Sequence, residues 1–588
     1  MKQFLKYTLA VICGLLIWGV IKLFILLGFI GSLATVGTTT TVAKPHSIYE
    51  LELKGSVVEY QTDKDRMTSS MMQAFDNDEY TVYGLNEILA NIREAKTNPK
   101  IDGIYLHGGQ MQMGYATAEA LHDALLDFRE SGKFVIAYAD RYGQANYYVA
   151  TAADSLYVNP TGMLTWSGLG ANISFYAKML EKLGVEMQVV KVGTFKSAVE
   201  PFVRTDMSEP NRLQYSTLLN DIWLQMNRDV AVARHLTTDQ LNALAERNML
   251  FQPQTEYVET GLVDGLAYVQ DVEDKLAELT GTDDYELLSY DDMAGVRANQ
   301  VKSAPNLAVL YAVGDITDDT GDGIVGKKMV ETIGEIADDD NIQAVVFRIN
   351  SGGGSAYASE QINHALELLK QKKPLVVSMG DYAASGGYYI ACNADYIFAE
   401  PTTLTGSIGI FGLIPNVKKL TEKIGVSVDG VETHEHANFE TDIITRGMNS
   451  EERAMLQAEI NRGYDLFTRR CAEGRGMTQD DIKKIGEGRV WSGIRAMEIG
   501  LVDNLGSLQD AIDKAAELAE LDDYVVGEYP EPEDLWEKFF ESVQKSASVQ
   551  ALAERVVGKE RYQTLRYMER LAAEPTIQAR LPYFIEIN

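Results

Sequence analysis

Short runs of apolar, mostly β-branched residues alternate along this chain with amphipathic stretches such as Ala358–Lys370. Alternating strands and helices indicate βαβ units with right-handed crossovers. Strands that are apolar on both faces indicate a sheet covered by helices on each side. The pattern therefore predicts an α/β fold with ligands at the carboxyl ends of its strands. In the C-terminal half the predicted strands are Leu307–Val313, Ala344–Ile349, Pro374–Met379, Tyr396–Ala399 and Val426–Val431.

The whole pattern occurs twice. Phe134–Gly184 aligns without a gap with Leu375–Gly425, at a constant spacing of 241 residues. Such self-similarity predicts two tandem domains of one fold, which we place at 46–305 and 306–525. Further expectations are a loop insertion at Gln61–Tyr80, a polar linker around 286–305, and a helical tail at 526–588 with no counterpart in the first copy.

The two copies differ at the positions that could carry chemistry. The second copy has Ser385 between an alanine and two glycines, where the first has Gln144. The first copy has Lys196 in GTFKSAVEP, where the same spacing places Ala437 in the second. A serine and a lysine can act as nucleophile and general base. Each copy therefore keeps one half of such a pair, and a complete site requires the copies to face each other.

Small residues surround Ser385, which directly follows a predicted strand. This suits a nucleophile at a tight strand-to-helix turn, with the amide of Gly386 aimed at the attacked carbonyl. The glycine run at 350–355 follows a neighbouring strand, and Gly353 is the candidate for a second oxyanion donor. Such a donor contributes about 3 kcal/mol to acyl transfer. A plain Gly/Ser-rich turn before a packed helix is the alternative for either segment.

Lys196 requires a special environment if it is to act as a base. The ordinary pKa of lysine is about 10.4, and burial lowers it by several units. A solvent-exposed lysine is the alternative interpretation. A histidine base also stays open, because folding assembles catalytic groups that are distant in sequence. The chain has seven histidines, of which His434 and His436 lie two apart.

Composition narrows the possible partners. The net charge of −32 argues against binding nucleic acid or an anionic membrane surface through a broad basic patch. The three cysteines show no zinc-ligand spacing, and the glycine run lacks the phosphate-loop pattern. We expect no metal and no cofactor.

The N-terminus has the pattern of a membrane anchor. Lys2 and Lys6 precede the apolar run Tyr7–Val36, which Lys22 interrupts. About 20 apolar residues suffice to span a bilayer. The leading lysines favour a cytoplasmic N-terminus, which puts the body outside the cytoplasm. We expect an uncleaved anchor and linker at 1–45, although the small residues at 32–34 leave cleavage open.

Four motifs carry a resemblance to a known family. GTFKSAVEPF, NSGGGSAYASE, GDYAASGGYYIA and TGSIGIFG, in this order, resemble signal peptide peptidase A (protease IV) in its long, double-repeat membrane form. The resemblance covers nearly the whole chain. It implies two ClpP/crotonase-like domains and a serine protease with a Ser–Lys dyad. One segment departs from the family pattern: the family usually has Ser-Pro-Gly-Gly where this chain has Ser351–Gly354. Without the proline, this loop has more conformational freedom in the unfolded chain.

The resemblance also implies roles for individual residues. Ser385 matches the nucleophile and Lys196 the base, while Ser407 matches a hydroxyl that helps to hold the lysine. Gly353 and Gly386 match the oxyanion hole.

The substrates implied by the resemblance are cleaved signal peptides and other apolar or unfolded peptides. It further implies a homotetramer held in the inner (cytoplasmic) membrane by one N-terminal helix, with the catalytic body on the periplasmic side. Two other classes stay open: a crotonase-like acyl-CoA enzyme, and a non-catalytic membrane scaffold or chaperone-like binder. The lysine segment and the anchor argue against the former, and the joint presence of Ser385, Lys196 and the glycine run against the latter.

Overall fold

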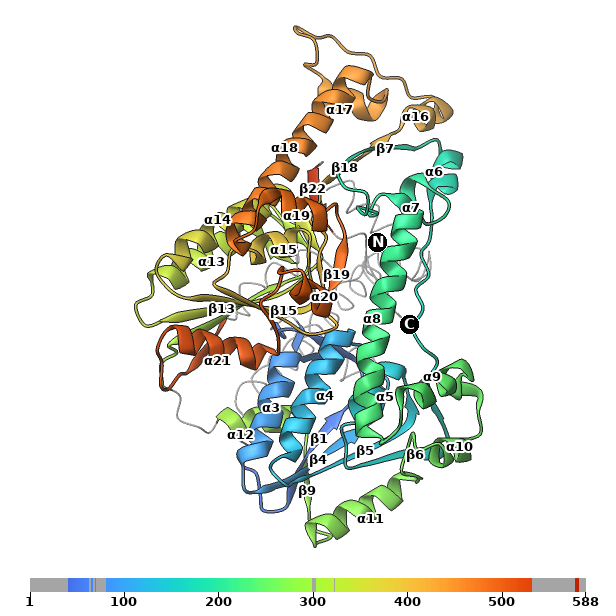
Figure 1. The fold of residues 1–588 in the computed structure, drawn as a ribbon, viewed down its shortest axis with the longest axis vertical. Helices are drawn as coiled ribbons and strands as arrows, with labels where there is room; N and C mark the ends of the chain where they lie inside the picture. The colour runs from blue at the N-terminus through green and yellow to red at the C-terminus, as the bar shows by residue number, and fades with distance from the viewer. Residues whose placement is uncertain are drawn as a thin grey trace, which may run out of the picture.

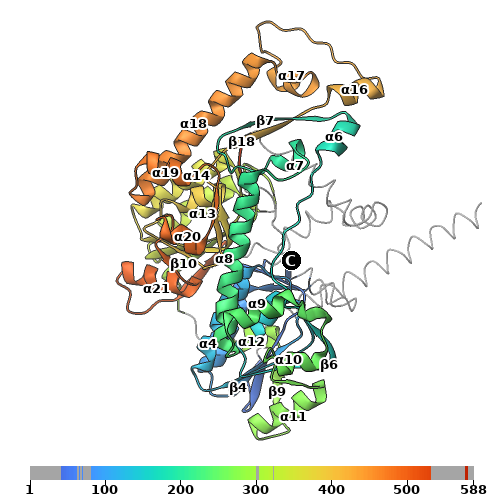
Figure 2. The same ribbon diagram turned by 45° about the vertical axis from the view of Figure 1, so that its right-hand side comes forward.

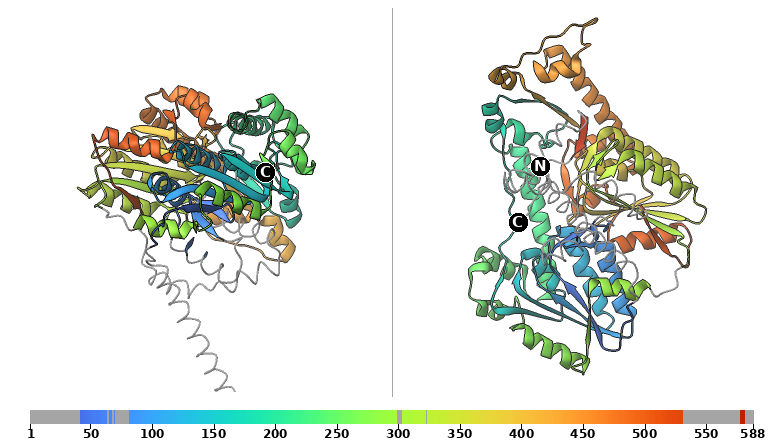
Figure 3. Two further views of the ribbon diagram at one scale, coloured as in Figure 1. Left: turned by 90° about the horizontal axis from the view of Figure 1, so that it is seen from below. Right: turned by 180° about the vertical axis from the view of Figure 1, so that it is seen from behind.

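The computed structural model describes residues 41–62, 65–66, 69, 81–298, 303–321, 323–530 and 577–580. The predicted anchor at 1–45 lies outside these residues except for its last five, and the insertion at Gln61–Tyr80 lies mostly outside them. Within the described part, no helix combines the length and the apolarity that a membrane crossing needs. Figure 1 shows two α/β lobes, with the first repeat at the bottom and the second above it. The view from behind in Figure 3 shows the same arrangement.

The first repeat is built on a six-stranded sheet in which all neighbouring strands are parallel. Alternate side chains enter two cores: Ile104 and Leu106 pack under α3 and α4, whereas Tyr105 packs with α11 on the opposite face. The sheet is thus apolar on both faces, as predicted. In sheet order the strands are β8 (Gly265–Leu266), β6 (Ser155–Leu164), β5 (Phe134–Tyr142), β4 (Ile101–His107), β1 (Ser47–Glu52) and β9 (Glu286–Leu288). The helices are α3 (Leu85–Thr97), α4 (Tyr115–Arg129), α5 (Gln144–Ala150) and α11 (Val269–Thr280).

The second repeat has a corresponding sheet. Its strand pairs are parallel except for β17 with β19. The order is β19 (Val490–Ser492), β17 (Leu404–Gly406), β15 (Leu375–Ala384), β13 (Ala344–Ser351), β10 (Leu307–Val313) and β21 (Val526–Tyr529), with β16 (Tyr396–Ala399) between β15 and β20 (Asn504–Leu505). Helices α13 (Gly326–Asp338), α14 (Ala356–Lys370) and α15 (Gly386–Ala391) cover one face, and α21 (Leu508–Leu518) covers the other.

The ends of the two sheets correct two sequence-based boundaries. β9 closes the first sheet by pairing with β1, and β21 closes the second in the same way by pairing with β10. The predicted linker therefore begins with a sheet strand. The first residues of the predicted helical tail are likewise a strand, with a counterpart in the first repeat. Short edge strands of this kind carry too few residues to show a periodicity.

The lysine-bearing segment leaves its own repeat. Helix α6 (Ala177–Leu183) and strand β7 (Glu186–Lys191) lie beside the second repeat, where β7 pairs antiparallel with β18 (Phe411–Asn416). Figures 1 and 2 show both strands at the top of the molecule, with the long helix α8 (Glu209–Ala233) returning to the first repeat.

The strand predicted at Val426–Val431 does not form, and this prediction was wrong. By spacing the segment corresponds to β7, yet its residues are exposed coil. Alternating valines give the pattern of a strand, but a strand also needs an edge to pair with. In the first repeat that edge is β18, which the other repeat supplies.

A third sheet draws strands from both repeats. Its order is β12 (Ile324–Val325), β11 (Ile316–Thr317), β14 (Gly353–Ser355), β22 (Ile577–Arg580), β18 and β7. The remaining elements are β2 (Ser56–Val58), β3 (Val82–Gly84), α7 (Glu200–Val203), α9 (Thr238–Glu246), η2 (Met249–Phe251), α10 (Gln254–Glu259), α12 (Tyr290–Ala298), α16 (Lys418–Ile424), α17 (Phe439–Thr445), α18 (Ser450–Arg475), α19 (Gln479–Ile485) and α20 (Gly493–Glu498).

The long helices α8 and α18 occupy corresponding places and begin at capping residues. Ser208 accepts a hydrogen bond from the Asn211 amide, and a proline stands in the first turn of α8. Asn449 and Glu452 form a reciprocal capping box at the start of α18. These contacts satisfy amides that a helix leaves unpaired at its N-terminus.

A buried ion pair joins the repeats. Arg348 on β13 donates from Nε and Nη2 to the two carboxylate oxygens of Glu59, over 2.9 and 3.1 Å. Its Nη1 donates to Ser378 Oγ at 2.8 Å and to the Met379 carbonyl at 3.1 Å. Both side chains are only 2% exposed, so the network depends on having all of its members.

Replacing one member of this pair should therefore be costly. We expect Arg348→Met to lower the free energy of unfolding by about 3–5 kcal/mol, because it leaves a buried carboxylate unpaired. The double variant Glu59→Leu, Arg348→Met should recover most of the loss. Urea denaturation measures both, with Lys372→Met as the control, since the Lys372–Asp338 pair is exposed. A loss as small as that of the control would contradict the network's role.

Candidate active site

Ser385 stands at the junction of β15 and α15 in an unusual backbone conformation. Its φ is 57° and its ψ is −115°, a region that non-glycine residues seldom adopt. Its amide donates to the Gly406 carbonyl at 2.8 Å, and its own carbonyl accepts from the Tyr389 amide at 2.8 Å. A backbone of this kind costs about 1–3 kcal/mol and persists where the surrounding structure enforces it. The turn places the Ser385 hydroxyl at the carboxyl end of the sheet.

Lys196 lies in the turns after β7 and reaches Ser385 of the same chain. Its Nζ lies 2.8 Å from Ser385 Oγ and 3.0 Å from both the carbonyl oxygen and the Oγ of Ser407. All three residues are fully buried. The structure thus brings together the serine and the lysine that the two repeats had kept separately, and adds the predicted Ser407.

Burial governs the charge of Lys196. It lowers the pKa of the amine well below the ordinary 10.5, and desolvation is the cause. A neutral amine has two N–H donors and one lone pair. The three contacts match this set: the carbonyl and the hydroxyl oxygen of Ser407 accept, which leaves the lone pair for the Ser385 hydroxyl. A lysine held in this way can remove a proton from the serine.

Ser407 is itself held in place from the second repeat. Its φ is 52°, and its amide donates to the Arg489 carbonyl at 2.7 Å. Its hydroxyl makes a long contact of 3.5 Å with the Gly488 carbonyl. Because Ser407 Oγ can accept from Lys196 and donate onward to Gly488, it fits a role in orienting the amine.

The segment Gly486–Trp491 is a part of the site that sequence reasoning missed. Gly488 has φ +75°, and a Cβ on it would lie 2.6 Å from the Cβ of Lys196. Phe195 donates its amide to the Glu487 carbonyl at 2.9 Å, and the Arg489 guanidinium lies over the Phe195 ring at 5.0 Å. This segment therefore covers the lysine. Two glycines spaced by one residue before an apolar strand were the only signal in the sequence.

The two glycines predicted as oxyanion donors lie next to each other. A Cβ on Gly353, whose φ is +96°, would stand 2.5 Å from the amide nitrogen of Gly386, so the close approach requires a residue without a side chain. The Gly353 amide already donates to Ser351 Oγ at 3.1 Å. To serve as an oxyanion donor, the Gly353 amide would have to share its hydrogen with a second acceptor or give up its bond to Ser351. Gly386 stands directly after Ser385, at the start of α15.

In the first repeat, the counterparts of Ser385 and Ser407 make structural contacts, and the counterpart of Lys196 lies at the surface. Gln144 donates to the Gly168 carbonyl at 3.1 Å and accepts from the Ser167 amide at 3.0 Å. Trp166 stands where the spacing places Ser407, is fully buried, and donates to the Leu241 carbonyl at 2.9 Å. Ala437, the predicted counterpart of Lys196, is exposed in a turn.

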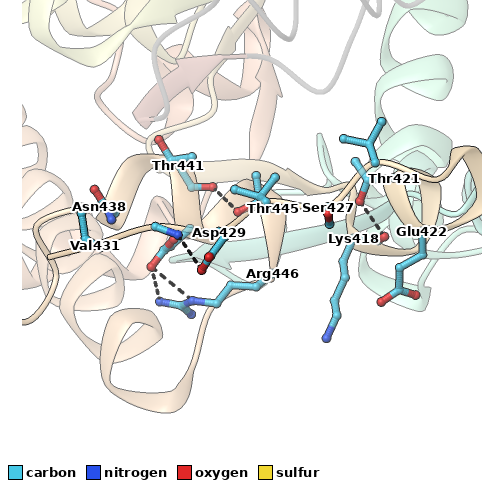
Figure 4. A pocket seen from close by; sticks show the side chains of 14 residues that line it. Lys418, Thr421, Glu422, Ser427, Asp429, Val431, Asn438, Thr441, Thr445 and Arg446 are labelled. Atoms are coloured by element: carbon cyan, nitrogen blue, oxygen red, sulfur yellow. Dashed lines mark hydrogen bonds and ion pairs between the residues drawn. The ribbon is translucent and has the colours of Figure 1, made fainter.

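Two other candidate features lie away from Ser385. A cavity of about 450 Å³ near α16 and α17 has a mixed lining. Its polar residues include Lys418, Asp429 and Arg446, as Figure 4 shows, and its apolar residues are Val426, Val428 and Val431. His434 is exposed, and His436 lies 3.8 Å from the carboxylates of Glu451 and Glu452. Lys196, and not either of these histidines, is the group in contact with the Ser385 hydroxyl.

The buried amine of Lys196 should change how the free energy of unfolding depends on pH. Between its lowered pKa and 10.5, Lys196 binds a proton in the unfolded chain but not in the folded one, so it makes stability rise with pH by about 1.4 kcal/mol per unit. Lys196→Met should lack this slope. Urea unfolding of both chains at pH 7, 8 and 9 tests this. Other groups, such as Glu119, whose pKa burial raises to about 8, act equally in both chains. Parallel curves would contradict a neutral Lys196.

Comparison with known proteins supports a common origin for both repeats. The model of "Peptidase family S49" matches residues 127–283 and 367–522. The chain is 34% identical to Protease 4 of Haemophilus influenzae over 88% of this chain and 87% of that protein. It is 35% identical to Protease 4 of Salmonella typhi, over 85% and 83% respectively. A chloroplastic serine protease SPPA of Arabidopsis thaliana is 30% identical over 74% and 66%.

Among solved structures, a ClpP1 mutant from Listeria monocytogenes covers 35% of this chain and 94% of its own, with a TM-score of 0.24 and 18% identity. The family assignment rests on long alignments, which include both Lys196 of the first repeat and Ser385 of the second. They confirm the resemblance to protease IV. The chain therefore belongs to peptidase family S49 and is a serine-type peptidase.

Proposed function

We propose that this peptidase is a membrane-anchored endopeptidase that uses Ser385 and Lys196 as a catalytic dyad to degrade signal peptides remaining in the membrane after processing. The observation that carries the proposal is the 2.8 Å contact between Lys196 Nζ and Ser385 Oγ in a fully buried setting. Desolvation favours the neutral amine, which is the form that can accept a proton.

The mechanism follows from the placement of these groups. Lys196 takes the proton of Ser385 as Oγ attacks the peptide carbonyl, and the amides of Gly386 and Gly353 stabilise the oxyanion. The Lys196 ammonium, held by the two oxygens of Ser407, then gives its proton to the leaving amine. A serine ester remains. Lys196 next deprotonates a water molecule, whose attack on the ester releases the acid and restores Ser385. The chain's own side chains supply every proton transfer, and we expect no metal or cofactor.

The choice of substrate rests on the N-terminal run and on the name of one relative. The lysines before the apolar run Tyr7–Val36 favour a single-pass anchor in the cytoplasmic membrane with the catalytic body on the periplasmic side. A putative signal peptide peptidase SppA from Enterococcus faecium is 35% identical over 33% of this chain. An enzyme fixed at the membrane surface would meet cleaved signal peptides, as well as other apolar or unfolded chains, where they lie.

We also propose that the chain assembles as a homotetramer. Within one chain β7 of the first repeat pairs with β18 of the second. The counterparts of these strands, Val426–Val431 and 170–175, are coil with exposed residues in both segments. Pairing of Val426–Val431 with 170–175 of the next chain would repeat the internal contact head to tail, and such a heterologous contact forms a ring when the rotation between subunits closes.

Loss of the serine should abolish hydrolysis, and replacement of the lysine by a permanently charged side chain should slow it strongly. We expect Ser385→Ala to leave no measurable turnover, because no nucleophile remains. Lys196→Arg should lower kcat by about 10²–10⁴, because a guanidinium stays protonated. Ser407→Ala should lower kcat about tenfold by releasing the amine. Fluorogenic peptide turnover and labelling of Ser385 by a serine-directed phosphonate measure these effects.

Matched controls separate chemistry from folding in this experiment. Ser216→Ala and Lys418→Arg change an exposed serine and an exposed lysine, and both should keep full activity. Substantial turnover by a folded Ser385→Ala or Lys196→Arg chain would refute the dyad. Turnover of an acyl-CoA thioester in place of peptides would point instead to a crotonase-like enzyme.

The ring should depend on the exposed valines. We expect Val428→Asp to reduce the particle mass of the full-length, detergent-solubilised chain from four copies to one, because a carboxylate in a strand pairing with an apolar face is costly. Val232→Asp is the control, since Val232 is exposed near the end of α8. Light scattering after size exclusion gives the mass. A tetramer that survives Val428→Asp would exclude this contact.

A further inference from the structure

Two free cysteines lie side by side in the core of the second repeat. Cys392 is the C-cap of α15, the helix whose N-cap is Ser385, and Cys471 lies in α18. Both side chains are fully buried and belong to one apolar cluster, and their thiol groups are in hydrogen-bonding contact. The third cysteine of the chain, Cys13, lies in the apolar N-terminal run. The proposed mechanism uses neither of the two paired thiols.

The backbones that carry the two thiols approach each other closely. On α18, Phe467 stands four residues before Cys471 and Gly474 three residues after it, so all three share one face of the helix. The Phe467 ring stacks on the Tyr389 ring of α15, with the centroids 4.3 Å apart. A Cβ on Gly474 would lie 2.2 Å from the carbonyl oxygen of Cys392. Contacts on both sides of Cys471 thus direct it at Cys392, and a disulfide requires such a close approach of two backbones.

The polar groups around the thiols suit an oxidised pair. In the thiol form, Cys392 Sγ donates to the Tyr389 carbonyl over 3.2 Å. Oxidation removes this donor, but the same carbonyl also accepts from Asn363 Nδ2 at 2.8 Å. Asn363 Nδ2 lies 3.8 Å from Cys392 Sγ as well, and there the sulfur is the acceptor, which needs no thiol proton. Loss of the thiol protons therefore leaves the carbonyl of Tyr389 and the amide of Asn363 satisfied.

We propose that Cys392 and Cys471 form a disulfide in the folded enzyme. One S–S bond replaces two S–H bonds: the pair gives up two protons and two electrons, and an external disulfide takes them up and becomes two thiols. The inference rests on the proposed placement of the catalytic body outside the cytoplasm, where disulfides form and persist.

The oxidation belongs to the folding of the chain. Burial raises the pKa of the Cys471 thiol well above its ordinary value, so the folded protein holds little of the thiolate that attacks a disulfide. Before α18 packs against α15, both thiols are open to an external disulfide. Once the core has closed, the same burial protects the S–S bond from reductants.

The cross-link would enclose a part of the active site. Residues 393–470, between the two cysteines, include Ser407 and β18, the strand with which β7 pairs. A disulfide restricts the unfolded chain and so stabilises the segment that it closes. It would thereby tie the strand that receives the lysine-bearing segment to the helix that follows Ser385.

Trapping the thiols tests the pairing directly. The full-length Cys13→Ser chain is extracted from membranes in the presence of iodoacetamide and then denatured, so that only the paired cysteines can react. We expect no alkylated cysteine before reduction and two after it, together with a proteolytic fragment that joins the Cys392 and Cys471 peptides. Two alkylated cysteines before reduction would overturn the disulfide.

A second measurement uses stability. A phosphine reductant should lower the midpoint of urea unfolding of the unmodified chain by about 0.5–1 M, because it reaches the disulfide in the unfolded state. Cys471→Ser should lower the midpoint by a similar amount and should then be insensitive to the reductant. Cys13→Ser is the matched control and should keep the full response. An unmodified chain that does not respond to the reductant would count against the cross-link, since buried thiols that only pack do not change with it.

The outcomes separate this inference from the proposed function. Free thiols in a chain that still hydrolyses peptides would overturn the disulfide and leave the dyad of Ser385 and Lys196 standing. Free thiols in a chain whose body an external protease cannot reach in spheroplasts would overturn the disulfide and the proposed location together. A disulfide in a chain without turnover and without Ser385 labelling would support the pairing and refute the proposed function.

Discussion

The arrangement of the molecule depends on one buried contact, in which the amine of Lys196 lies 2.8 Å from the hydroxyl of Ser385. Lys196 touches Ser385 only because β7 crosses from the first repeat to pair with β18 of the second. Water must be excluded along this whole approach, since a solvated lysine holds its proton. Gly488 and Arg489 close over the lysine, and Ser407 satisfies the donors that the neutral amine retains. The site is therefore a property of the interface between repeats and not of either repeat alone.

Such an interface needs polar contacts that fix its geometry. Asp381, four residues before Ser385, accepts from the amide and the hydroxyl of Thr117 at the start of α4. Glu119 on the same helix accepts from the Thr402 hydroxyl at 2.8 Å. The first contact anchors α4 of the first repeat to β15, which ends at Ser385, and the second anchors it to the turn between β16 and β17. Directional bonds of this kind suit an interface that must hold two side chains within hydrogen-bond distance, which apolar packing alone does not specify.

Much of this could be predicted from the sequence, because periodicity and internal repetition are local signals. The sequence alone predicted the alternation of strands and helices, the duplication, and the placement of Ser385 and Lys196 on different repeats. The crossing of β7 to the second repeat could not be predicted, because a strand pattern does not indicate which sheet edge the strand will pair with. For the same reason Val426–Val431 was wrongly predicted as a strand. The covering segment around Gly488 carries no motif, since it acts through its backbone. β22 is four residues long, too short for a periodicity, and its position depends on a gap that exists only in the fold.

The filling of the first repeat's own site by Gln144 and Trp166 bears on how the chain can evolve. Gln144 is hydrogen-bonded on both sides of its amide, and Trp166 is buried where a serine would have to stand. Restoring a second reaction centre would require a serine at the first position and removal of an indole at the second. It would also require a lysine delivered by a segment that lies exposed as coil. Each of these changes would remove contacts that the first repeat now makes. The two repeats are thus complementary rather than interchangeable: one supplies Lys196 and the other Ser385, and neither has the residue that the other contributes.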